Sequence, residues 1–279
     1  MELYELTIKE IHQGYKAGKF SCEELVTALL TRTKKLNGKF NIYLTMNEGA
    51  LEEARKVDKR IKEKGIDLPL LGIPIAVKDN FLTKGMVTTA SAKVLGGYRP
   101  HYESTVTKKL LEAGAILMGK TNMDAWAHGS STETSDFGPT LNPWDEGRLP
   151  GGSSGGSAAA IAAQLVPVAI GSETAGSIRQ PAAWCGVVGV KPTYGRVSRY
   201  GVVAMASSTD SPGVMGRNIG DCALALSVIA GKDEYDGTSS DKMVEDYILA
   251  RKDLKGLKVG LISEYLMEDM SEEVKGLIK

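Results

Sequence analysis

The first part of the chain carries the hydrophobic spacing of three amphipathic helices. Two S/T-x-x-E capping boxes, beginning at Thr7 and Ser21, each open such a run. The second run gathers its leucines on one face and predicts a helix that ends near Gly38, because a glycine readily takes the left-handed conformation of a C′ residue. A third run, residues 49–64, is mostly charged and predicts a helix that ends at Gly65.

Short β-branched runs then alternate with helical ones. The β-branched runs predict strands over residues 73–77, 115–119, 166–171, 186–190 and 258–263. Helical spacing falls between them, over residues 104–113, 157–165 and 220–230. This alternation indicates an α/β sheet covered by helices. Because no linker follows the helical residues 1–65, we expect residues 1–279 to form a single domain in which 1–65 pack on the sheet.

The last predicted helix begins at Ser271. Val274, Leu277 and Ile278 then fall on one apolar face, but the sequence stops at Lys279 after barely two turns. A parallel sheet needs a crossover that returns to a strand. We therefore expect this helix to be the first half of an interrupted connection, in a domain that is incomplete at its C-terminus.

Charge and composition narrow the class of protein. The chain has 34 basic and 34 acidic side chains, which argues against a surface that holds nucleic acid by charge alone. No apolar run reaches the ~18 residues of a membrane span, and the acidic N-terminus does not fit a signal peptide. The three cysteines are widely spaced, which is not typical of a disulfide framework or a zinc ribbon. We expect a cytoplasmic protein without a metal site or a membrane anchor.

The Gly/Ser-rich run from Pro150 to Ala160 admits two interpretations. Its composition alone is typical of a flexible linker. The run also passes directly into a predicted helix and strand, which favours a Gly-rich turn whose free N–H groups suit an anionic group.

A second turn of small residues carries Ser177. One interpretation is structural, with a serine that caps a helix. The other is a nucleophile on a tight turn, where the backbone N–H groups of Thr174, Ala175 and Gly176 face a developing oxyanion. Such a serine needs a base, and none of the three histidines lies in a triad signature. Lys78 directly follows an apolar strand, and a buried lysine loses its proton readily, although most lysines are solvated.

The run GAILMGKT, residues 114–121, matches the Walker A pattern letter for letter. In a P-loop the four variable positions form the loop that cradles phosphate. Here those positions are four apolar residues, which predict a strand. We therefore expect Lys120 and Thr121 to end that strand, and a nucleotide-binding protein is a less favoured alternative.

The segments GIPIAVKDN, PGGSSGGSAAA, GSETAGSIRQPAAWCG and KPTYGRVSRYG resemble, in this order, the amidase signature family. The resemblance extends over essentially the whole chain and implies an α/β/α sandwich with a mixed central sheet. It also implies a triad that hydrolyses amides. In that triad Ser177 is the nucleophile, Ser153 is the bridging serine after a cis peptide bond, and Lys78 is the base.

Within the family, the run MDAWAHGSSTETSDFGPTLNPW is similar to the branch that releases ammonia from glutamine for tRNA-dependent amidation. That similarity implies that Gly129, Ser130 and Ser131 help to bind substrate. It further implies two partner subunits, called B and C, which bind ATP, Mg²⁺ and Glu-tRNA(Gln) or Asp-tRNA(Asn), while this chain holds no cofactor. A stand-alone amidase acting on another small amide and an inactive piece that only docks to partners are the alternatives.

Three residues depart from the family pattern. Glu173 and Ala175 stand where Asp and Gly are common, and Ala175 would be strained if the turn required a positive φ there. His128 stands where Met is common. The chain is also shorter than family members, so we expect a truncated protein with an open pocket and weak turnover.

Overall fold

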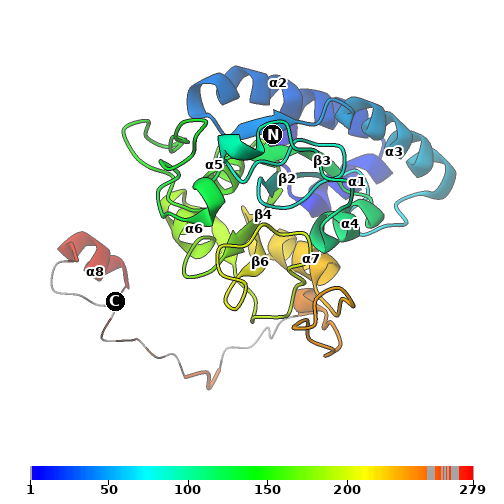
Figure 1. Cartoon of the computed structure of the whole chain (residues 1–279). Coiled ribbons are helices and arrows are strands. Elements are labelled where there is room, and N and C mark those ends of the chain that lie inside the picture. Colours follow the sequence, from blue (N-terminus) through cyan, green and yellow to red (C-terminus); the bar gives the residue numbers. More distant parts are fainter. Residues whose placement is uncertain are drawn as a thin grey trace. The chain divides into compact units, whose positions relative to one another are not determined.

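A computed structural model describes residues 2–249, 255–258, 260, 262, 264 and 270–278 of the chain (Figure 1). Its contacts divide the chain into two compact units, Met1–Ile248 and Leu249–Lys279. All strands in the described residues belong to the first unit. A single domain over residues 1–279 therefore stays a prediction.

The first unit is built on a six-stranded sheet with the order β1-β3-β2-β4-β6-β5. Strand β2 runs parallel to its neighbours β3 and β4, and the three remaining pairings are antiparallel. The mixed sheet expected from the family resemblance is thus confirmed. The strands are β1 (Tyr43–Met46), β2 (Pro74–Lys78), β3 (Ile116–Thr121), β4 (Val168–Glu173), β5 (Val188–Val190) and β6 (Ser211–Gly216).

Helices pack against this sheet and share one apolar core with it. Helices α2 and α3 contact each other along one side of the unit, and α5 packs on β2, β3, β4 and β6 (Figure 1). None of the described helices has the length and apolar composition of a membrane span. The helices are α1 (Ile8–Lys16), α2 (Cys22–Phe40), α3 (Ala50–Lys64), α4 (Thr105–Glu112), α5 (Gly155–Ala162), α6 (Arg179–Trp184) and α7 (Ile219–Ile229), with short 3-10 turns η1 (Leu3–Glu5), η2 (Lys93–Leu95), η3 (Ala125–Ala127) and η4 (Tyr247–Leu249).

The helix caps confirm the local sequence signals, with one exception. The side chains of Thr7 and Ser21 accept hydrogen bonds from the N3 backbone of α1 and α2, and Gly65 ends α3 with a φ of 71°. The predicted end of α2 near Gly38 is wrong, because the helix continues to Phe40. Asn41 takes the left-handed conformation instead, at φ 50°, and its amide donates to three backbone carbonyls of residues 137–139.

Two strands were not predicted. β1 is short and mostly half-buried, and β6 contains Pro212 and two glycines, which weaken the pattern of a strand. The strand predicted over residues 258–263 falls partly outside the described residues, and Lys258, Gly260 and Ile262 are not in a strand. In the second unit, α8 (Glu272–Ile278) begins where predicted, and Ser271 Oγ accepts a hydrogen bond from Val274 N at 3.3 Å.

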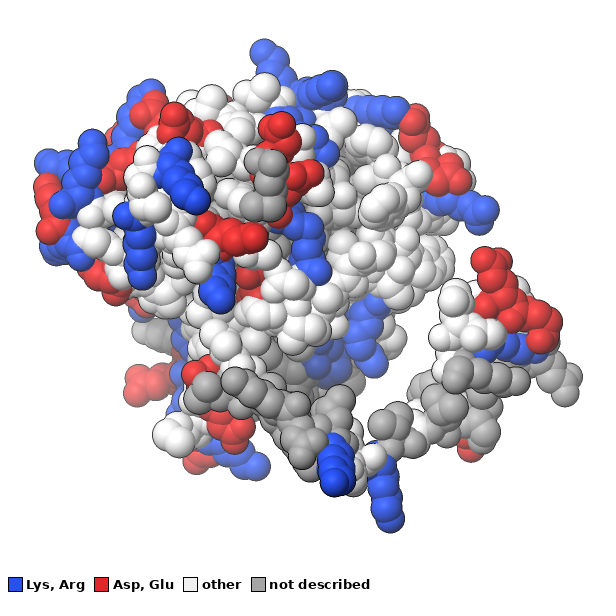
Figure 2. Space-filling model, turned by 180° about the vertical axis from the view of Figure 1, so that it is seen from behind, with Lys and Arg blue, Asp and Glu red and all other residues white. Residues whose placement is uncertain are grey.

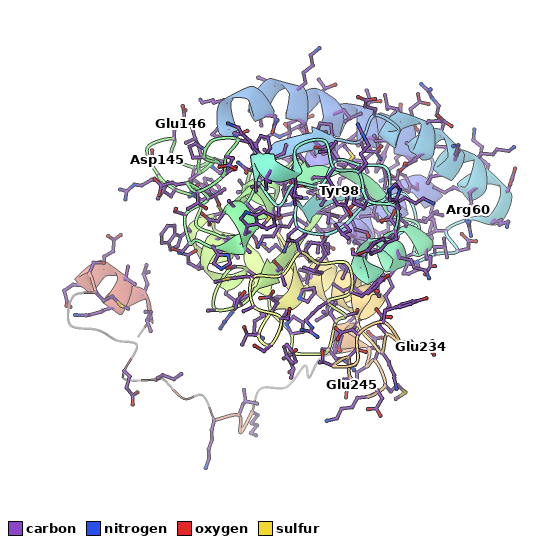
Figure 3. All side chains as sticks on the ribbon, in the orientation of Figure 1. Arg60, Tyr98, Asp145, Glu146, Glu234 and Glu245 are labelled. Atoms are coloured by element: carbon purple, nitrogen blue, oxygen red, sulfur yellow. The ribbon has the colours of Figure 1, made fainter. Side chains whose placement is uncertain are left out.

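The surface carries both signs of charge. Figure 2 shows acidic and basic side chains interspersed over the end of the molecule where α3 lies. Lys56 pairs with Glu52 on that helix, and the Arg60 guanidinium donates to Asp67. Glu146, labelled in Figure 3, pairs with a lysine near the end of α2. Such exposed pairs add little stability, so the fold rests on the core.

The first turn of α5 shows why small residues are needed in the core. A Cβ added to Gly156 would lie 2.4 Å from Asn122 O and 2.9 Å from Ile42 O. These atoms belong to the backbone and cannot rotate away. The alanines that follow in α5 are buried. The Gly/Ser-rich run is therefore a closely packed helix start, and the linker interpretation is wrong.

A pair of glycine substitutions tests this packing. Gly156→Ala should lower the free energy of unfolding by about 1–3 kcal/mol, because the added methyl group overpacks the core. Gly38→Ala is the matched control, since Gly38 lies inside α2 with no atom within 4 Å of an added Cβ. The control should raise the free energy of unfolding by about 0.5–1 kcal/mol. Urea unfolding measures both, and equal effects at the two sites would contradict the packing argument.

Lys120 lies near the end of β3, as the apolar composition of residues 115–118 predicted, and its side chain is completely buried. Its Nζ lies 3.3 Å from Asp79 Oδ1 and donates to Phe81 O at 2.7 Å and Thr88 Oγ1 at 2.9 Å. Both members of the ion pair are completely buried. The segment that matches the Walker A pattern is therefore a core strand, and its lysine organises the loop after β2.

Breaking this pair should be costly. Lys120→Met should lower the free energy of unfolding by about 3–5 kcal/mol, because the carboxylate of Asp79 stays buried without its cation. The double variant Asp79→Asn/Lys120→Met should recover part of the loss. Lys56→Met, which removes an exposed cation, is the control and should leave stability nearly unchanged. A Lys120→Met protein as stable as the wild type in urea would refute this account of the loop.

Candidate active site

Strand β2 carries Lys78 into the interior of the sheet. β2 lies between β3 and β4, and all of its side chains are buried. The Nζ of Lys78 donates to Ser153 Oγ at 2.8 Å and to Ser172 Oγ and O at 3.0 and 3.1 Å. No part of Lys78 is exposed. The sequence interpretation of a buried rather than a solvated lysine is confirmed.

Burial lowers the pKa of Lys78 to about 7, because desolvation disfavours the ammonium form. The carboxylates of Asp124, Asp210 and Glu173 act in the opposite direction by attracting the positive charge. Both protonation states of the amine are therefore populated near neutral pH. A group with these properties can accept a proton and return it.

Ser153 lies at the start of the segment that leads into α5, directly after a cis peptide bond to Gly152. The resemblance implied this bond. Asp124 N donates to Ser153 O at 3.1 Å, and Gly152 N donates to Gln180 Oε1 at 2.9 Å. A Cβ on Gly152 would lie 2.0 Å from Asp124 Oδ2, so only glycine fits there. These contacts fix the backbone on both sides of the Ser153 hydroxyl.

Ser177 lies in the turn between β4 and α6, and Glu173 closes that turn. The Glu173 carboxylate accepts hydrogen bonds from Ile178 N at 2.9 Å and Arg179 N at 3.0 Å, and it pairs with the Arg179 guanidinium. Burial opposes the ionisation of Glu173, but these hydrogen bonds hold its pKa below the usual value. Ser154 N donates to Ser177 O at 3.1 Å, which joins this turn to the Ser153 segment.

The turn presents backbone N–H groups. Within the described part of the chain, no acceptor bonds to the N–H of Thr174, Ala175, Gly176 or Ser177. The positive φ of this turn, 144°, falls at Gly176 and not at Ala175. The alanine that departs from the family pattern therefore carries no such strain.

A cavity of about 240 Å³ opens in front of this turn. The predicted oxyanion residues and Ser177 line it, and so do Gly129 and Ser130. Ser131 does not, but its N–H donates to Asp124 Oδ2 at 3.2 Å. His128 is exposed, and its Nδ1 lies 3.0 Å from Trp126 O. The lining residues are Ala127, Gly129, Ser130, Gly152, Thr174, Ala175, Gly176, Ser177, Gln180 and Met205.

The structure thus brings Lys78 and Ser153 into direct contact, and the hydrogen bond from Ser154 N to Ser177 O links this pair to the turn of the third predicted triad residue. Among the described residues no hydrogen bond joins the hydroxyl groups of Ser153 and Ser177. Sequence reasoning missed the polar residues Asp124, Ser172, Gln180 and Asp210, which hold the loops around the triad. Two of these residues could have been found from the sequence. Ser172 lies at the carboxyl end of β4 and Asp124 follows that of β3, at the same edge of the sheet where Lys78 ends β2. The position of Asp210 near the site could not be predicted, because it depends on the antiparallel strand β6, which the sequence analysis did not predict.

Comparisons with known proteins show which sequences and folds the chain is similar to. The chain is 52% identical to the A subunit of glutamyl-tRNA(Gln) amidotransferase from Prochlorococcus marinus over 276 residues, which cover 96% of this chain and 57% of that protein. It is 51% identical to the corresponding protein from Carboxydothermus hydrogenoformans over 280 residues, covering 100% of this chain and 58% of that protein. The chain therefore spans little more than half the length of these curated relatives.

Solved structures show the same fold. The A subunit of the glutamyl-tRNA(Gln) amidotransferase from Thermotoga maritima has a TM-score of 0.76 and 43% identity, covering 87% of this chain and 50% of that one. The peptide amidase from Stenotrophomonas maltophilia has a TM-score of 0.83 and 37% identity, covering 88% of this chain and 52% of that one. The sequence profile of the family described as Amidase matches residues 24–279. The resemblance inferred from the motifs is thereby confirmed, and the chain belongs to the amidase family.

Proposed function

We propose that this protein hydrolyses a carboxamide with Ser177 as nucleophile, Ser153 as bridging serine and Lys78 as base. The observation that carries the proposal is the 2.8 Å hydrogen bond between Lys78 Nζ and Ser153 Oγ. This bond links an amine whose pKa is about 7 to a segment that is itself bonded to the turn of Ser177. No histidine is needed for such a relay.

In the first half-reaction, Ser177 Oγ attacks the amide carbon of the substrate. The proton of Ser177 passes to Ser153, and that of Ser153 passes to neutral Lys78. The free N–H groups of residues 174–177 stabilise the oxyanion that forms. As the carbon–nitrogen bond breaks, the proton returns through Ser153 to the leaving nitrogen, which departs as ammonia and leaves an acyl-enzyme.

In the second half-reaction, a water molecule attacks the acyl carbon. The same relay takes a proton from this water and returns it to Ser177 Oγ as the ester bond breaks. A carboxylic acid is released and the three residues regain their starting protonation states. Because Lys78 must be neutral at the start of each half-reaction, the reaction rate should depend on pH.

The substrate is the side-chain amide of glutamine, and the ammonia serves tRNA-dependent amidation. Support comes from relatives of about 50% identity, each named as the A subunit of glutamyl-tRNA(Gln) amidotransferase. In this role two partner subunits, B and C, complete the enzyme in the cytoplasm. They bind ATP, Mg²⁺ and Glu-tRNA(Gln) or Asp-tRNA(Asn), and this chain binds none of them.

A stand-alone amidase is the second candidate. It is favoured by the likeness to the peptide amidase of Stenotrophomonas maltophilia, whose fold agrees over 88% of this chain. The two candidates differ in their need for partners. An amidase releases ammonia from a small amide by itself, whereas a glutaminase component gains activity on glutamine when its partners and aminoacyl-tRNA are added.

Covalent labelling tests the roles of the two serines. A fluorophosphonate should label Ser177, and Ser177→Ala should abolish the labelling. Ser153→Ala should slow it by about 10²–10⁴, the usual contribution of an acid–base relay. Ser157→Ala is the control, because this buried hydroxyl bonds to Thr121 and Ile170 O and should leave labelling intact. Mass spectrometry that places the adduct on Ser153 or Ser154 would overturn the assignment.

The pH dependence tests the base. Protonated Lys78 cannot accept a proton, so labelling of Ser177 should fall as the pH drops through about 7, the pKa of this amine. Lys78→Ala should remove labelling, and Lys78→Arg should fail as well, because a guanidinium stays protonated. We call the fall of the labelling rate at low pH the acid limb. Near-native labelling of the Lys78→Arg protein, or an acid limb at the pKa of an ordinary lysine, would exclude this mechanism.

A further inference from the structure

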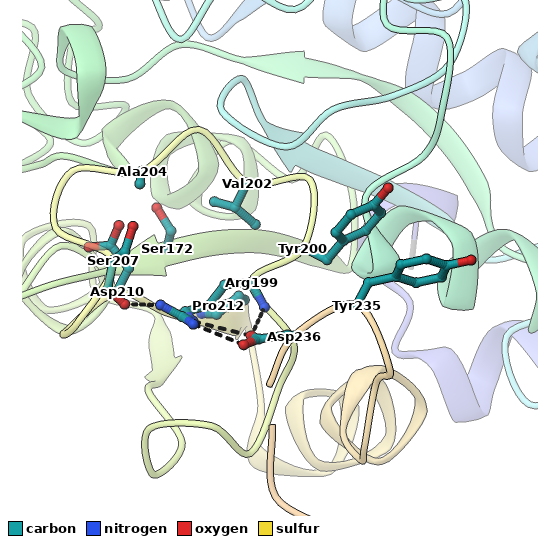
Figure 4. Close-up of a pocket in the computed structure, with 10 residues that line it drawn as sticks. All are labelled: Ser172, Arg199, Tyr200, Val202, Ala204, Ser207, Asp210, Pro212, Tyr235 and Asp236. Atoms are coloured by element: carbon teal, nitrogen blue, oxygen red, sulfur yellow. Dashed lines mark hydrogen bonds and ion pairs between the residues drawn. The ribbon is translucent and has the colours of Figure 1, made fainter. Parts of the chain in front are cut away.

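A second cavity lies against Ser172, a hydrogen-bond partner of Lys78. Figure 4 shows it, and its volume is about 190 Å³. Ser172 lines this cavity, and its hydroxyl oxygen also accepts hydrogen bonds from Lys78 Nζ and Asn80 Nδ2, each at 3.0 Å. The lining residues are Ser172, Arg199, Tyr200, Val202, Ala204, Ser207, Asp210, Pro212, Tyr235 and Asp236.

Asp210 contributes to both cavities. It lines the second one, and its buried carboxylate holds two residues that line the cavity of Ser177. Asp210 Oδ1 accepts a hydrogen bond from Thr174 Oγ1 at 2.5 Å, and Oδ2 accepts one from Met205 N at 2.9 Å. Ala206 N contributes two longer contacts of 3.2 Å. One carboxylate therefore joins Thr174 and Met205, which are thirty-one residues apart in the sequence.

The contact to Thr174 bears on the backbone of the turn. Thr174 is the first of the residues whose N–H groups have no acceptor within the described ranges. A hydroxyl that is anchored to a buried carboxylate restricts the side-chain torsion of Thr174 and the orientation of its peptide. Met205, the other anchored residue, lines the same cavity.

We propose that Asp210 is a positioning residue, which holds the Thr174 turn and Met205 at a fixed separation and orients the N–H group that receives the oxyanion. This inference rests on the proposed amide hydrolysis. Asp210 does not touch the substrate and acts through Thr174 and Met205. It goes beyond the triad, because Asp210 directly precedes β6, the strand that pairs antiparallel with β4, and β4 carries Ser172.

The charge of Asp210 supplies an independent readout. Three carboxylates act on Lys78, namely Asp124, Asp210 and Glu173. Glu173 is paired with Arg179, whereas Asp210 attracts the Arg199 guanidinium, which lines the same cavity, without an ion-pair contact among the described residues. Removal of an anion that attracts the ammonium form lowers the pKa of Lys78. Loss of Asp210 should therefore move the acid limb of the reaction to lower pH, an effect that loss of the Thr174 contact alone does not produce.

The test compares variants of the full chain in the fluorophosphonate reaction of Ser177. Asp210→Asn and Thr174→Val should each slow labelling about 10- to 100-fold, less than the 10²–10³ lost with a whole oxyanion donor. The double variant should be no slower than the slower single variant, because both changes break one contact. Asp210→Asn should shift the acid limb to lower pH, whereas Thr174→Val, which removes no charge, should leave it in place.

Asp236→Asn is the matched control. Asp236 lines the same cavity and is paired with Arg199, but it is not among the carboxylates that act on Lys78. This variant loses the same charge and should keep both the rate and the acid limb of the wild type. Wild-type rates for Asp210→Asn and Thr174→Val, additive losses in the double variant, or an equal shift of the limb in Asp236→Asn would overturn the proposal.

Hydrogen exchange separates this proposal from the proposed function. The amide hydrogens of Met205 and Ala206 should exchange faster in Asp210→Asn than in the wild type and the Asp236→Asn control. If the wild type is not labelled at Ser177, the proposed hydrolysis fails, and unchanged exchange in Asp210→Asn then also refutes the positioning role. If Asp210→Asn does not fold, the labelling rate and acid limb of Thr174→Val decide the matter.

Discussion

The burial of one amine is the constraint on which the rest of the site depends. An ammonium group loses its hydration when the sheet closes over Lys78, so the neutral form becomes accessible near pH 7. The hydroxyls of Ser153 and Ser172 and the carbonyl of Ser172 supply the hydrogen-bond partners that water would otherwise supply. Nearby carboxylates limit the shift of the pKa. The fold itself thus prepares the amine for the role of base that we propose for it.

The loops around Lys78 can pack closely against one another only because they carry small residues. Gly152 lies against the Asp124 carboxylate, and Gly156 lies against the backbone of Asn122, so neither position has space for a side chain. The approach brings the Ser153 segment into hydrogen-bonding contact with the turn of Ser177. The same packing that stabilises the start of α5 therefore assembles the candidate active site.

Features that depend on a few neighbouring residues could be predicted from the sequence. The caps at Thr7 and Ser21, the apolar strand that ends in Lys78 and the core character of residues 115–118 all follow from local spacing. Features that depend on distant strand pairing could not. Asp210 lies near the site because β6 pairs antiparallel with β4. The sequence of β6 contains Pro212 and two glycines, so it lacks the hydrophobic pattern that predicts a strand. The turn of small residues made Ser177 a candidate nucleophile, whereas the bridging role of Ser153 came only from the family resemblance. The hydrogen bond of Ser153 with Lys78 is the contact that such a role requires.

The central claim is that the fold leaves Lys78 with a neutral amine near pH 7. Titration of this one amine by ¹⁵N nuclear magnetic resonance tests it directly, with the spectrum of Lys78→Arg to identify the signal. The account predicts a midpoint near pH 7, the value to which burial lowers the pKa of Lys78. A midpoint near 10.5, the ordinary value for a lysine, would contradict the account.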